Sequence, residues 1–296
     1  MILLTGTTGF IGSYLLDALI EKYGRDQVIV LTSKPTNKCH FILHNNYNFD
    51  KDFFFNEGFS NIKTIIHAGA FVPKSTTESE DIEKCNSNIN NTYALIFAEL
   101  PSLKNFIFIS SVDVYGYENQ ITENSIEKPI SLYGHSKLYC EQLISAWASQ
   151  NNIKHQILRI GHVYGPGEEK YQKVIPITMQ QLFRNEAIQL WGEGKDIRSF
   201  IYISDEIQAI LKSINLENSS GIINIVGQEQ ITISELINKI IVISNIPATI
   251  DKINSSTQPR DLIFDNKKMK ELLHIPNVNL DQGLSLEWDY MKNLIA

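Results

Sequence analysis

The sequence predicts an α/β fold: a doubly wound parallel sheet with a smaller, interleaved α/β lobe formed mainly by the C-terminal part of the chain. The first half of the chain alternates short apolar runs with longer amphipathic stretches, which is the pattern of successive βαβ units. A glycine-rich turn, from Gly6 to Gly12, joins the first apolar run to the first amphipathic stretch. Further along the chain the segments become shorter and turn signals denser, as in Gly165-Pro166-Gly167 and Gly192-Glu193-Gly194.

The predicted elements follow from this alternation. Strands are expected at residues 1–5, 27–32, 63–67, 105–110 and 155–160, where short runs are rich in Ile, Leu, Val and Phe. Helices are expected at residues 11–22, 81–99 and 131–149, where apolar and polar residues alternate with helical spacing. The order of these elements places helices on both faces of a parallel sheet.

Composition excludes several classes of protein. With 43% hydrophobic residues in 296, the chain can bury a substantial core. Its 26 Lys and Arg against 33 Asp and Glu give a formal charge of −7, which argues against a nucleic-acid partner. No apolar run approaches the roughly 20 residues that span a bilayer, so no membrane partner is expected. No charged leader precedes the first apolar segment, so no signal peptide is expected.

The cysteines suggest a compartment. Cys39, Cys85 and Cys140 are widely spaced, odd in number and form no CxxC pair. This pattern suits free thiols in a reducing environment, and it predicts a cytoplasmic protein without a metal site.

The glycine-rich turn is the first motif that carries chemistry. Glycines at positions 6, 9 and 12 lie between a strand and a helix, so the backbone can approach a pyrophosphate closely. The helix N-terminus then offers its N–H groups to the phosphates. The turn predicts a dinucleotide site of the Rossmann type, with contacts from Gly6, Thr8, Gly9, Phe10, Ile11 and Gly12.

This site defines the expected domains. The dinucleotide-binding domain is predicted to span residues 1–168, and a later strand and helix near residues 195–225 return to it. Residues 169–296 are predicted to form mainly the substrate-binding lobe.

The end of the second strand bears on which dinucleotide binds. Sites for NAD usually place an acid there, on the ribose 2′-hydroxyl. This chain has Thr32, Ser33 and Lys34 instead. Two hydroxyls and a cation can bind a 2′-phosphate that an acid would repel, so NADP(H) is favoured, with NAD(H) as the alternative.

A tyrosine and a lysine open the third predicted helix. Tyr133 and Lys137 are four residues apart and share one helix face. A neighbouring ammonium is expected to lower the pKa of the phenol, so that Tyr133 can exchange a proton with a sugar hydroxyl or keto oxygen. Ser111, at the end of the strand predicted at 105–110, would bond the same oxygen. These three residues are the predicted catalytic group.

Taken together, these motifs give a resemblance that runs over nearly the whole chain. The sequence resembles the extended short-chain dehydrogenase/reductases, in their NAD-dependent epimerase/dehydratase group that modifies nucleotide sugars. Asn91 stands where that family usually has Gly, and Asn48-Phe49 stands where it has Asp-Ile for the adenine. The resemblance implies further cofactor contacts from Asn48, Phe49, Ala68, Gly69, Ala70, Asn88, Ile109, Ile160, His162 and Val163, as well as Tyr133 and Lys137.

The same resemblance implies a nucleotide-diphosphate sugar as substrate. Arg198 and Arg260 lie in segments similar to those whose arginines bind the diphosphate, and each guanidinium can donate bidentate bonds to it. His162 replaces the usual Asn, and it either bonds the sugar or simply packs. The implied substrate residues are Ser111, Asp113, Tyr133, His162, Lys173, Val174, Trp191, Arg198 and Arg260.

Several reactions share this scaffold. Reduction of a 4-keto (6-deoxy) sugar nucleotide by NADPH is favoured, because the ribose acid is missing. A 4-epimerase with tightly bound NAD is the alternative. A 4,6-dehydratase is disfavoured because Val112 cannot move a proton. Asp113 with Lys173 as a C3/C5 epimerising pair, and a catalytically silent dinucleotide sensor, are the remaining alternatives.

The resemblance also implies a homodimer through the helices at 81–99 and 131–149. Leu138, Leu143, Ile144 and Trp147 give the second helix an apolar stripe. Ordinary core packing would explain the same stripe.

Overall fold

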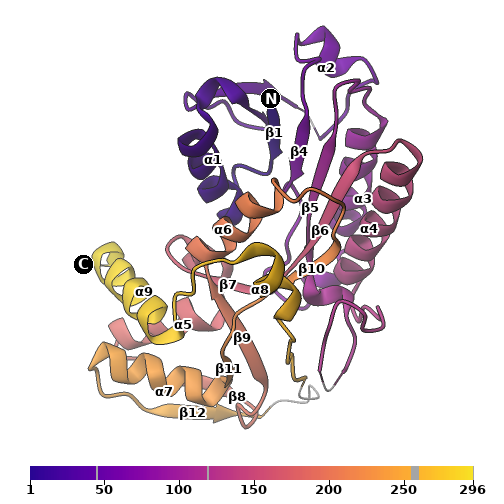
Figure 1. Cartoon of the computed structure of the whole chain (residues 1–296). Coiled ribbons are helices and arrows are strands. Elements are labelled where there is room, and N and C mark those ends of the chain that lie inside the picture. Colours follow the sequence, from indigo (N-terminus) through magenta and orange to yellow (C-terminus); the bar gives the residue numbers. More distant parts are fainter. Residues whose placement is uncertain (45, 119, 255–259, 296) are drawn as a thin grey trace. The chain divides into compact units, whose positions relative to one another are not determined.

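The computed structural model describes residues 1–44, 46–118, 120–254 and 260–295. The chain forms two compact units (Figure 1). Unit 1 contains Met1–Gly116, Ile126–Ile160 and Ile207–Ile223, and unit 2 contains Tyr117–Ser125, Gly161–Glu206 and Asn224–Ala296. Compared with the predicted division at residue 168, unit 2 also takes 117–125 and 161–168, and the segment that returns to unit 1 is 207–223.

Unit 1 is built on a seven-stranded sheet in the order β10-β6-β5-β4-β1-β2-β3. Strands β3, β2, β1, β4, β5 and β6 pair in parallel, and the order reverses between β1 and β4, as in a doubly wound fold. The predicted fold class is therefore confirmed. The strands are β1 (Ile2–Thr5), β2 (Val28–Thr32), β3 (His40–Leu43), β4 (Thr64–His67), β5 (Asn105–Ser111), β6 (Lys154–Ile160) and β10 (Gly221–Ile225).

The helices of unit 1 lie on both faces of this sheet. Figure 1 shows α1 (Phe10–Tyr23) on one face and α3 (Ile82–Phe97) with α4 (Leu132–Gln150) side by side on the other. The strands are buried along their whole length for this reason, as β1, β2 and β5 show. The short helix α2 (Phe53–Asn56) and the second half of α6 (Ile203–Ser213) complete the unit.

Two elements of unit 1 were missed by the pattern. Strand β3 is an edge strand of four residues, of which only Ile42 is buried. Helix α2 is a single turn within an aromatic cluster, where Phe49 stacks on Phe53 with ring centroids 4.7 Å apart. Elements this short have no periodicity to detect.

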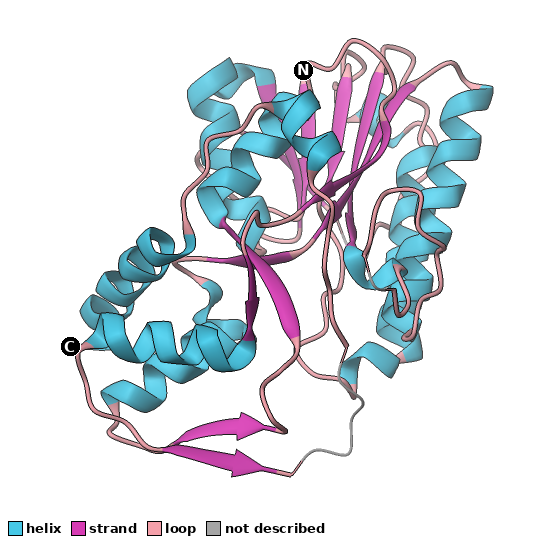
Figure 2. Cartoon of the chain, turned by 60° about the horizontal axis from the view of Figure 1, so that its bottom comes forward, coloured by secondary structure: helices cyan, strands magenta, loops and turns pink. Residues whose placement is uncertain are grey.

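Unit 2 contains two small sheets and four helices among the residues that the structure describes. One sheet has the order β11-β9-β7, and the other pairs β12 with β8. Helices α5, α7 and α9 pack together beside the β8–β12 pair (Figure 2). The elements are β7 (His162–Tyr164), α5 (Val174–Phe183), β8 (Ile188–Trp191), β9 (Ile197–Tyr202), β11 (Gln230–Thr232), α7 (Ile233–Ser244), β12 (Ile250–Ile253), α8 (Lys267–Leu273) and α9 (Leu280–Ile295).

A capping motif stabilises one of these helices, and an aromatic contact holds two others together. Thr232 and Glu235 form a capping box at the start of α7, which satisfies two backbone N–H groups. Helix α9 packs on α5 through Phe183 and Trp288, whose rings stack 4.2 Å apart. Within the described ranges, no helix is long and apolar enough to cross a membrane.

Unit 2 also buries carboxyl groups with unpartnered oxygens among the described residues. Glu168 and Glu287 are buried, and both oxygens of Glu287 lack a hydrogen-bond partner among the described residues. Burial raises the pKa of Glu168 to about 8, with smaller effects from Lys173 and the neighbouring acids. Burial, with Glu169, raises that of Glu287 to about 7. Both side chains therefore favour the protonated form in the fold.

This pair makes stability depend on pH. The folded state holds the Glu287 proton more tightly than the unfolded chain. Ionisation of Glu287 therefore lowers the free energy of unfolding, by nothing below about pH 4.5 and by an amount that grows until pH passes 7. The shift corresponds to roughly 3 kcal/mol at pH 8. Glu287→Gln is therefore expected to raise the melting temperature by several degrees at pH 8 and by little at pH 4, measured by differential scanning calorimetry. Glu271→Gln, on the exposed face of α8, is the control, and an equal gain at both pH values would contradict the assignment.

Candidate active site

The glycine-rich turn is packed so closely that two of its three glycines are required. Gly6 has a φ of +79°, and a Cβ there would lie 2.5 Å from the backbone of Ala68. A Cβ on Gly12 would lie 2.1 Å from the Gly6 carbonyl oxygen. At Gly9 the nearest atom would be 3.3 Å away, so this position has more room.

This turn fits the phosphates of a dinucleotide. Gly9 is the N-cap residue of α1, and no described side chain caps the helix. The first turn of α1 therefore keeps its N-terminal dipole and backbone groups directed toward an anion. Thr8 and its neighbours Phe10 and Ile11 lie at this end of the helix, as predicted.

The end of β2 presents a cation beside hydroxyls. Thr32 is buried, and its hydroxyl donates to the Lys34 carbonyl at 3.0 Å and accepts from the Lys34 N–H at 3.2 Å. This turn leaves Ser33 and Lys34 exposed at the carboxyl end of the strand, where a dinucleotide places its adenosine ribose.

The predicted adenine residues have unequal positions. Asn48 is exposed, but Phe49 packs against the core and stacks on Phe53. The residue that reaches the glycine turn is Tyr47, which sequence reasoning missed. Its hydroxyl bonds Thr5, and a Cβ on Gly69 would lie 2.5 Å from it. No sequence pattern distinguishes Tyr47 from the other aromatic residues of this segment.

Behind the turn, His67 joins β1 to α3 through a hydrogen-bond chain whose direction can be assigned. The Thr92 hydroxyl donates to the Asn88 carbonyl at 2.8 Å, so it must accept from His67 Nε2 at 3.1 Å. The neutral ring thus carries its one proton on Nε2, so Nδ1 accepts from Thr5 Oγ1 at 2.8 Å, and Thr5 Oγ1 also accepts the Gly69 N–H at 2.8 Å. Burial, with Lys137 nearby, lowers the pKa of His67 to about 3, which keeps the ring neutral.

Asn88 clamps the loop that follows β4. Its amide oxygen accepts the Phe71 N–H at 2.8 Å, and its amide nitrogen donates to the Phe71 carbonyl and to Ser136 Oγ, each at 3.3 Å. The predicted contact segment Ala68, Gly69 and Ala70 lies in this loop. Asn88 thus supports the predicted cofactor surface through the backbone of the loop.

The three predicted catalytic residues are buried together in unit 1. Ser111 caps the short helix at Val112–Val114 that follows β5, and Tyr133 begins the first turn of α4. Gly134 allows the two to meet, because a Cβ there would lie 2.4 Å from the Asp113 carbonyl oxygen. The Ser111 hydroxyl bonds the Tyr133 phenol, and it donates to Asp113 Oδ2 at 3.2 Å.

The expected effect of Lys137 on Tyr133 is wrong in this structure. Burial raises the pKa of Tyr133, the Asp113 carboxylate raises it further, and the bond from Ser111 opposes them. The Lys137 ammonium instead donates to the Ile109 carbonyl at 2.8 Å and lies 4.9 Å from the centre of the Phe108 ring. Tyr133 is therefore held as a protonated phenol.

Lys137 is itself perturbed. Only 3% of its surface is exposed, and burial lowers its pKa to about 8, although Cys140 and Glu141 oppose this shift. Ile109, predicted as a cofactor contact, thus serves to hold the ammonium through its carbonyl. Ile160 is buried at the end of β6, next to β5 in the sheet.

In unit 2 the predicted substrate residues form a cationic group around His162. This residue begins β7 and pairs with Phe200 of β9, on the same strand as Arg198. Burial, followed by Arg198, Lys173 and Arg260, lowers the pKa of His162 to about 3. Three cations next to a neutral imidazole fit a ligand that carries several negative charges.

The two arginines are linked directly. An Arg198 guanidinium nitrogen donates to the Arg260 carbonyl, and the Arg260 guanidinium lies 5.8 Å from the Tyr117 ring centre. Pro259, which directly precedes Arg260 in the sequence, lies outside the described residues.

The other predicted residues of unit 2 are more scattered. Lys173 caps α5 by its backbone and Val174 begins that helix. Val163 lies in the middle of β7, and Trp191 ends β8 with 63% of its surface exposed.

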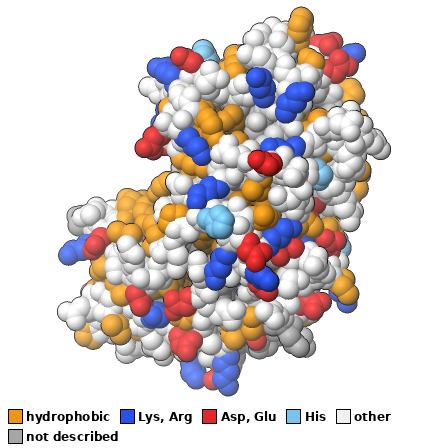
Figure 3. Space-filling view, viewed as in Figure 1, with side chains coloured by type: hydrophobic (Ala, Val, Ile, Leu, Met, Phe, Trp, Pro, Cys, Tyr) orange, Lys and Arg blue, Asp and Glu red, His pale blue; other side chains and the backbone are white. Residues whose placement is uncertain are grey.

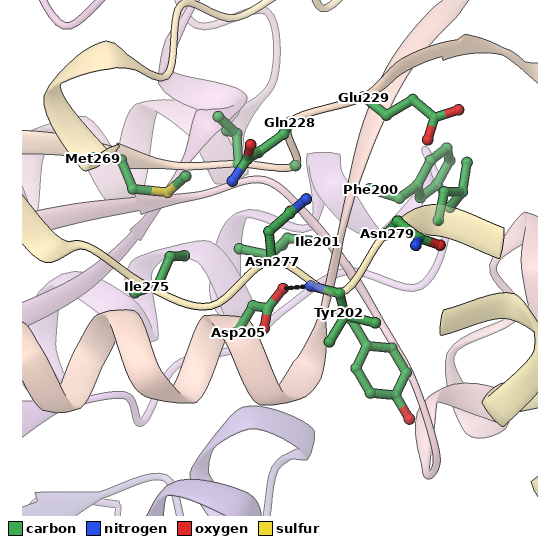
Figure 4. A pocket seen from close by; sticks show the side chains of 14 residues that line it. Phe200, Ile201, Tyr202, Asp205, Gln228, Glu229, Met269, Ile275, Asn277 and Asn279 are labelled. Carbon is green, nitrogen blue, oxygen red and sulfur yellow. Dashed lines mark hydrogen bonds between the residues drawn. The ribbon is translucent and has the colours of Figure 1, made fainter. Parts of the chain in front are cut away.

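A separate pocket in unit 2 contains none of the predicted site residues. It lies between β9, the loop after β10 and the segment around α8, and Phe200, Gln228, Asn277 and Asn279 are among its lining residues (Figure 4). Asp205 forms part of its wall and accepts the Val278 N–H at 2.7 Å. On the face drawn in Figure 3, Lys and Arg side chains are interspersed with Asp and Glu and form no single basic field.

Comparison with known proteins identifies the family of this chain. The model of the NAD dependent epimerase/dehydratase family matches residues 2–226. A dTDP-4-dehydro-6-deoxyglucose reductase of Escherichia coli is 32% identical over 305 residues, which cover 96% of this chain and 95% of the relative.

Solved structures agree over the full length. A UDP-glucose 4-epimerase of Thermotoga maritima, solved with UDP-glucose, is 26% identical with a TM-score of 0.88 and covers 100% of this chain and 99% of its own. A UDP-glucuronic acid 4-epimerase of Bacillus cereus, solved with NAD, is 27% identical with a TM-score of 0.84 and has the same coverage. The resemblance that the motifs carry is thereby confirmed, and this chain belongs to the NAD dependent epimerase/dehydratase family of extended short-chain dehydrogenase/reductases.

Proposed function

We propose that the protein reduces a 4-keto (6-deoxy) nucleotide-diphosphate sugar with NADPH, and that Tyr133 is the proton donor. The observation that carries this proposal is the end of β2, where Thr32, Ser33 and Lys34 stand in place of the acid of an NAD site. Burial raises the pKa of the Tyr133 phenol, which suits a proton donor. Reduction of a ketone consumes one proton at the oxygen, so the enzyme must begin with a protonated donor. Oxidation of a hydroxyl, with which a 4-epimerase begins, requires a base instead.

The residues of unit 1 divide the work. NADPH, when bound, supplies hydride to the C4 carbon of the sugar. Tyr133 gives its proton to the carbonyl oxygen, and Ser111 bonds the same oxygen. Lys137, whose ammonium is held by the Ile109 carbonyl, is proposed to contact the nicotinamide ribose of the cofactor. Asp113 accepts the single Ser111 hydroxyl proton in this structure, and Ser111 is proposed to redirect that proton to the carbonyl oxygen when the sugar binds.

The cofactor assignment rests on the end of β2. Thr32, Ser33 and Lys34 offer hydroxyls and an ammonium where an NAD site would place an acid. The turn formed by Gly6, Gly9 and Gly12 would hold the pyrophosphate.

The substrate assignment rests on unit 2. Arg198, Arg260 and Lys173 would bind the diphosphate, with backbone N–H groups from the start of α5 at Val174. Trp191 and His162 are proposed to contact the nucleoside and the sugar. The reductase relative acts on a dTDP-linked keto sugar by its name.

A 4-epimerase with bound NAD is the second candidate, because both solved structures described above are 4-epimerases of UDP-sugars. A 4,6-dehydratase is disfavoured by Val112, which has no proton to give.

NADPH oxidation separates the two candidates. With dTDP-, CDP- or GDP-linked 4-keto-6-deoxy sugars, the protein is expected to oxidise NADPH, measured at 340 nm, and Tyr133→Phe should lower kcat by at least about 100-fold. NADPH binding by the variant should stay within a few-fold, since the phenol oxygen is proposed to serve the sugar. If the protein reduces no keto sugar but interconverts UDP-glucose and UDP-galactose without added cofactor, the reductase proposal is refuted and the 4-epimerase is supported. A protein that binds NADPH but turns over neither set would be the silent sensor.

The reaction should have an alkaline limit set by Lys137. Its ammonium is lost as pH rises through about 8, so kcat is expected to decline above that pH while binding of the sugar nucleotide changes less. The measurement is kcat and KM between pH 6 and 10. A kcat that stays flat to pH 10 would contradict the assigned role of the ammonium.

Cofactor preference can be tested at the end of β2. Lys34→Ala should weaken NADPH binding by about tenfold, which corresponds to one ion pair with the 2′-phosphate. NADH binding should change little. Lys38→Ala, whose ammonium bonds Asp17 at 2.6 Å, is the matched control. Equal losses for both dinucleotides would argue against 2′-phosphate recognition by Lys34.

A homodimer through α3 and α4 is part of the proposal. Most of the apolar stripe predicted on α4 does not belong to this dimer interface, because Ile144 is buried and Leu143 and Trp147 pack on the core of unit 1. Exposed apolar side chains do lie on these helices, and Leu138 lines a groove between them. The exposed group contains Ile82, Tyr93, Phe97, Leu132 and Tyr139.

Sedimentation velocity at micromolar concentration is expected to give a dimer for the wild type. Tyr139→Glu should give a folded monomer, because it places a charge in the proposed interface. Val242→Glu, at an exposed apolar position of α7, is the control. A monomeric wild type would refute the dimer.

A further inference from the structure

Unit 1 contains a buried ion pair that the proposed chemistry does not use. Arg159 of β6 is fully buried and Glu141 of α4 is 3% exposed. Arg159 Nη2 donates to Glu141 Oε2 at 2.6 Å, and Nε lies 3.1 and 3.2 Å from the two carboxylate oxygens. This is a bidentate, charge-assisted arrangement between a strand and the helix that carries Tyr133 and Lys137.

The same carboxylate reaches the strand that carries the catalytic serine. Ser110 Oγ donates to Glu141 Oε1 at 2.5 Å, and Ser110 directly precedes Ser111. Glu141 lies four residues after Lys137 and eight after Tyr133, so the three share one face of α4. One carboxylate is therefore tied to β5 immediately before Ser111 and to α4 one turn beyond Lys137.

Arg159 extends the connection to the segment that follows Ser111. Its Nη2 also donates to Glu127 Oε1 at 2.6 Å, and its guanidinium carbon lies 4.6 Å from the centre of the Tyr115 ring. Tyr115 and Glu127 form an antiparallel bridge. The guanidinium is thus held between Glu141 of α4 and the bridged residues Tyr115 and Glu127.

Stability alone is a poor reason for this arrangement. Burying two charges carries a large desolvation penalty, and replacing such a pair by apolar residues of similar size is often neutral or stabilising. What the pair does provide is a fixed geometry, because a bidentate contact between a guanidinium and a carboxylate is directional. Catalysis depends on such geometry, since a displacement of about 1 Å can cost about 100-fold in rate.

We propose that Glu141 and Arg159 are positioning residues that hold Ser111 against Tyr133, by fixing the end of β5 relative to α4. The inference rests on the proposed function for its kinetic readout, because Ser111 and Tyr133 must act on a common oxygen. It adds a role for two residues that touch neither substrate nor cofactor in that proposal.

The decisive variant replaces both members of the pair. Glu141→Leu with Arg159→Met removes the charges together and leaves no unpaired buried ion. Its melting temperature is expected to stay within a few degrees of the wild type or to rise. Its kcat is expected to fall by about 100-fold, with KM for both substrates within threefold. The control is Lys51→Met with Glu99→Leu, which removes an exposed ion pair of unit 1 and should leave kcat unchanged.

Two further measurements keep the inference testable if the double variant is unstable. Ser110→Ala leaves the ion pair intact and breaks only its bond to β5, and it should lower kcat by about tenfold at an almost unchanged melting temperature. Glu141→Gln keeps an acceptor but removes the charge that favours the Lys137 ammonium, so the alkaline limit of kcat should move to lower pH.

The outcomes separate this inference from the proposed function. A folded double variant with wild-type kcat would overturn the positioning role while the proposed function stands. A wild type without keto-sugar reduction would refute the proposed function. A crystal structure of the double variant then decides the inference. A lost contact between Ser111 Oγ and the Tyr133 phenol would support it, and an unchanged contact would overturn it.

Discussion

The close approach of Gly6 to the backbone of Ala68 is the contact on which the rest of unit 1 depends. It brings the carboxyl ends of β1 and β4 together at the point where the strand order reverses. A side chain at Gly6 would separate these two strands. Their separation would break the contacts of Thr5 with Gly69 and His67, through which the turn is joined to α3. The glycine turn is therefore linked to α3 by side-chain hydrogen bonds that depend on this close approach.

The second determinant of the site is burial. Tyr133, Lys137 and His67 each lie in an interior where the charged form is disfavoured, and each has a pKa shifted in that direction. A phenol that stays protonated, an ammonium that is easily lost and a neutral imidazole follow from the same physical cause. The sheet thus sets the protonation states of the site by excluding water from it.

Much of this could be predicted from the sequence, for identifiable reasons. The strands β1, β2, β4, β5 and β6 are buried apolar runs, and the helices α1, α3 and α4 have enough residues to show a period. Their predicted bounds agree with the structure within about two residues, the margin that separates methods of assignment. The glycine turn and the tyrosine–lysine spacing are local patterns. His67, Tyr47 and Glu141 were missed because their roles depend on partners distant in the chain. The pKa of Tyr133 was misjudged because Asp113 and the Ile109 carbonyl enter through packing, which spacing in a helix does not reveal.

The hydrogen-bond chain through His67 has a consequence for how this sequence can change. The chain runs from Gly69 through Thr5 and His67 to Thr92 and Asn88, and each proton in it has one donor and one acceptor. Replacing Thr5 by valine would keep the shape but leave an imidazole nitrogen without a donor, and replacing Thr92 would strand the proton on the other nitrogen. A substitution at one of these threonines or at the histidine therefore leaves a buried polar group without its partner and lowers stability. In sequences that descend from this one, we expect the three residues to change together.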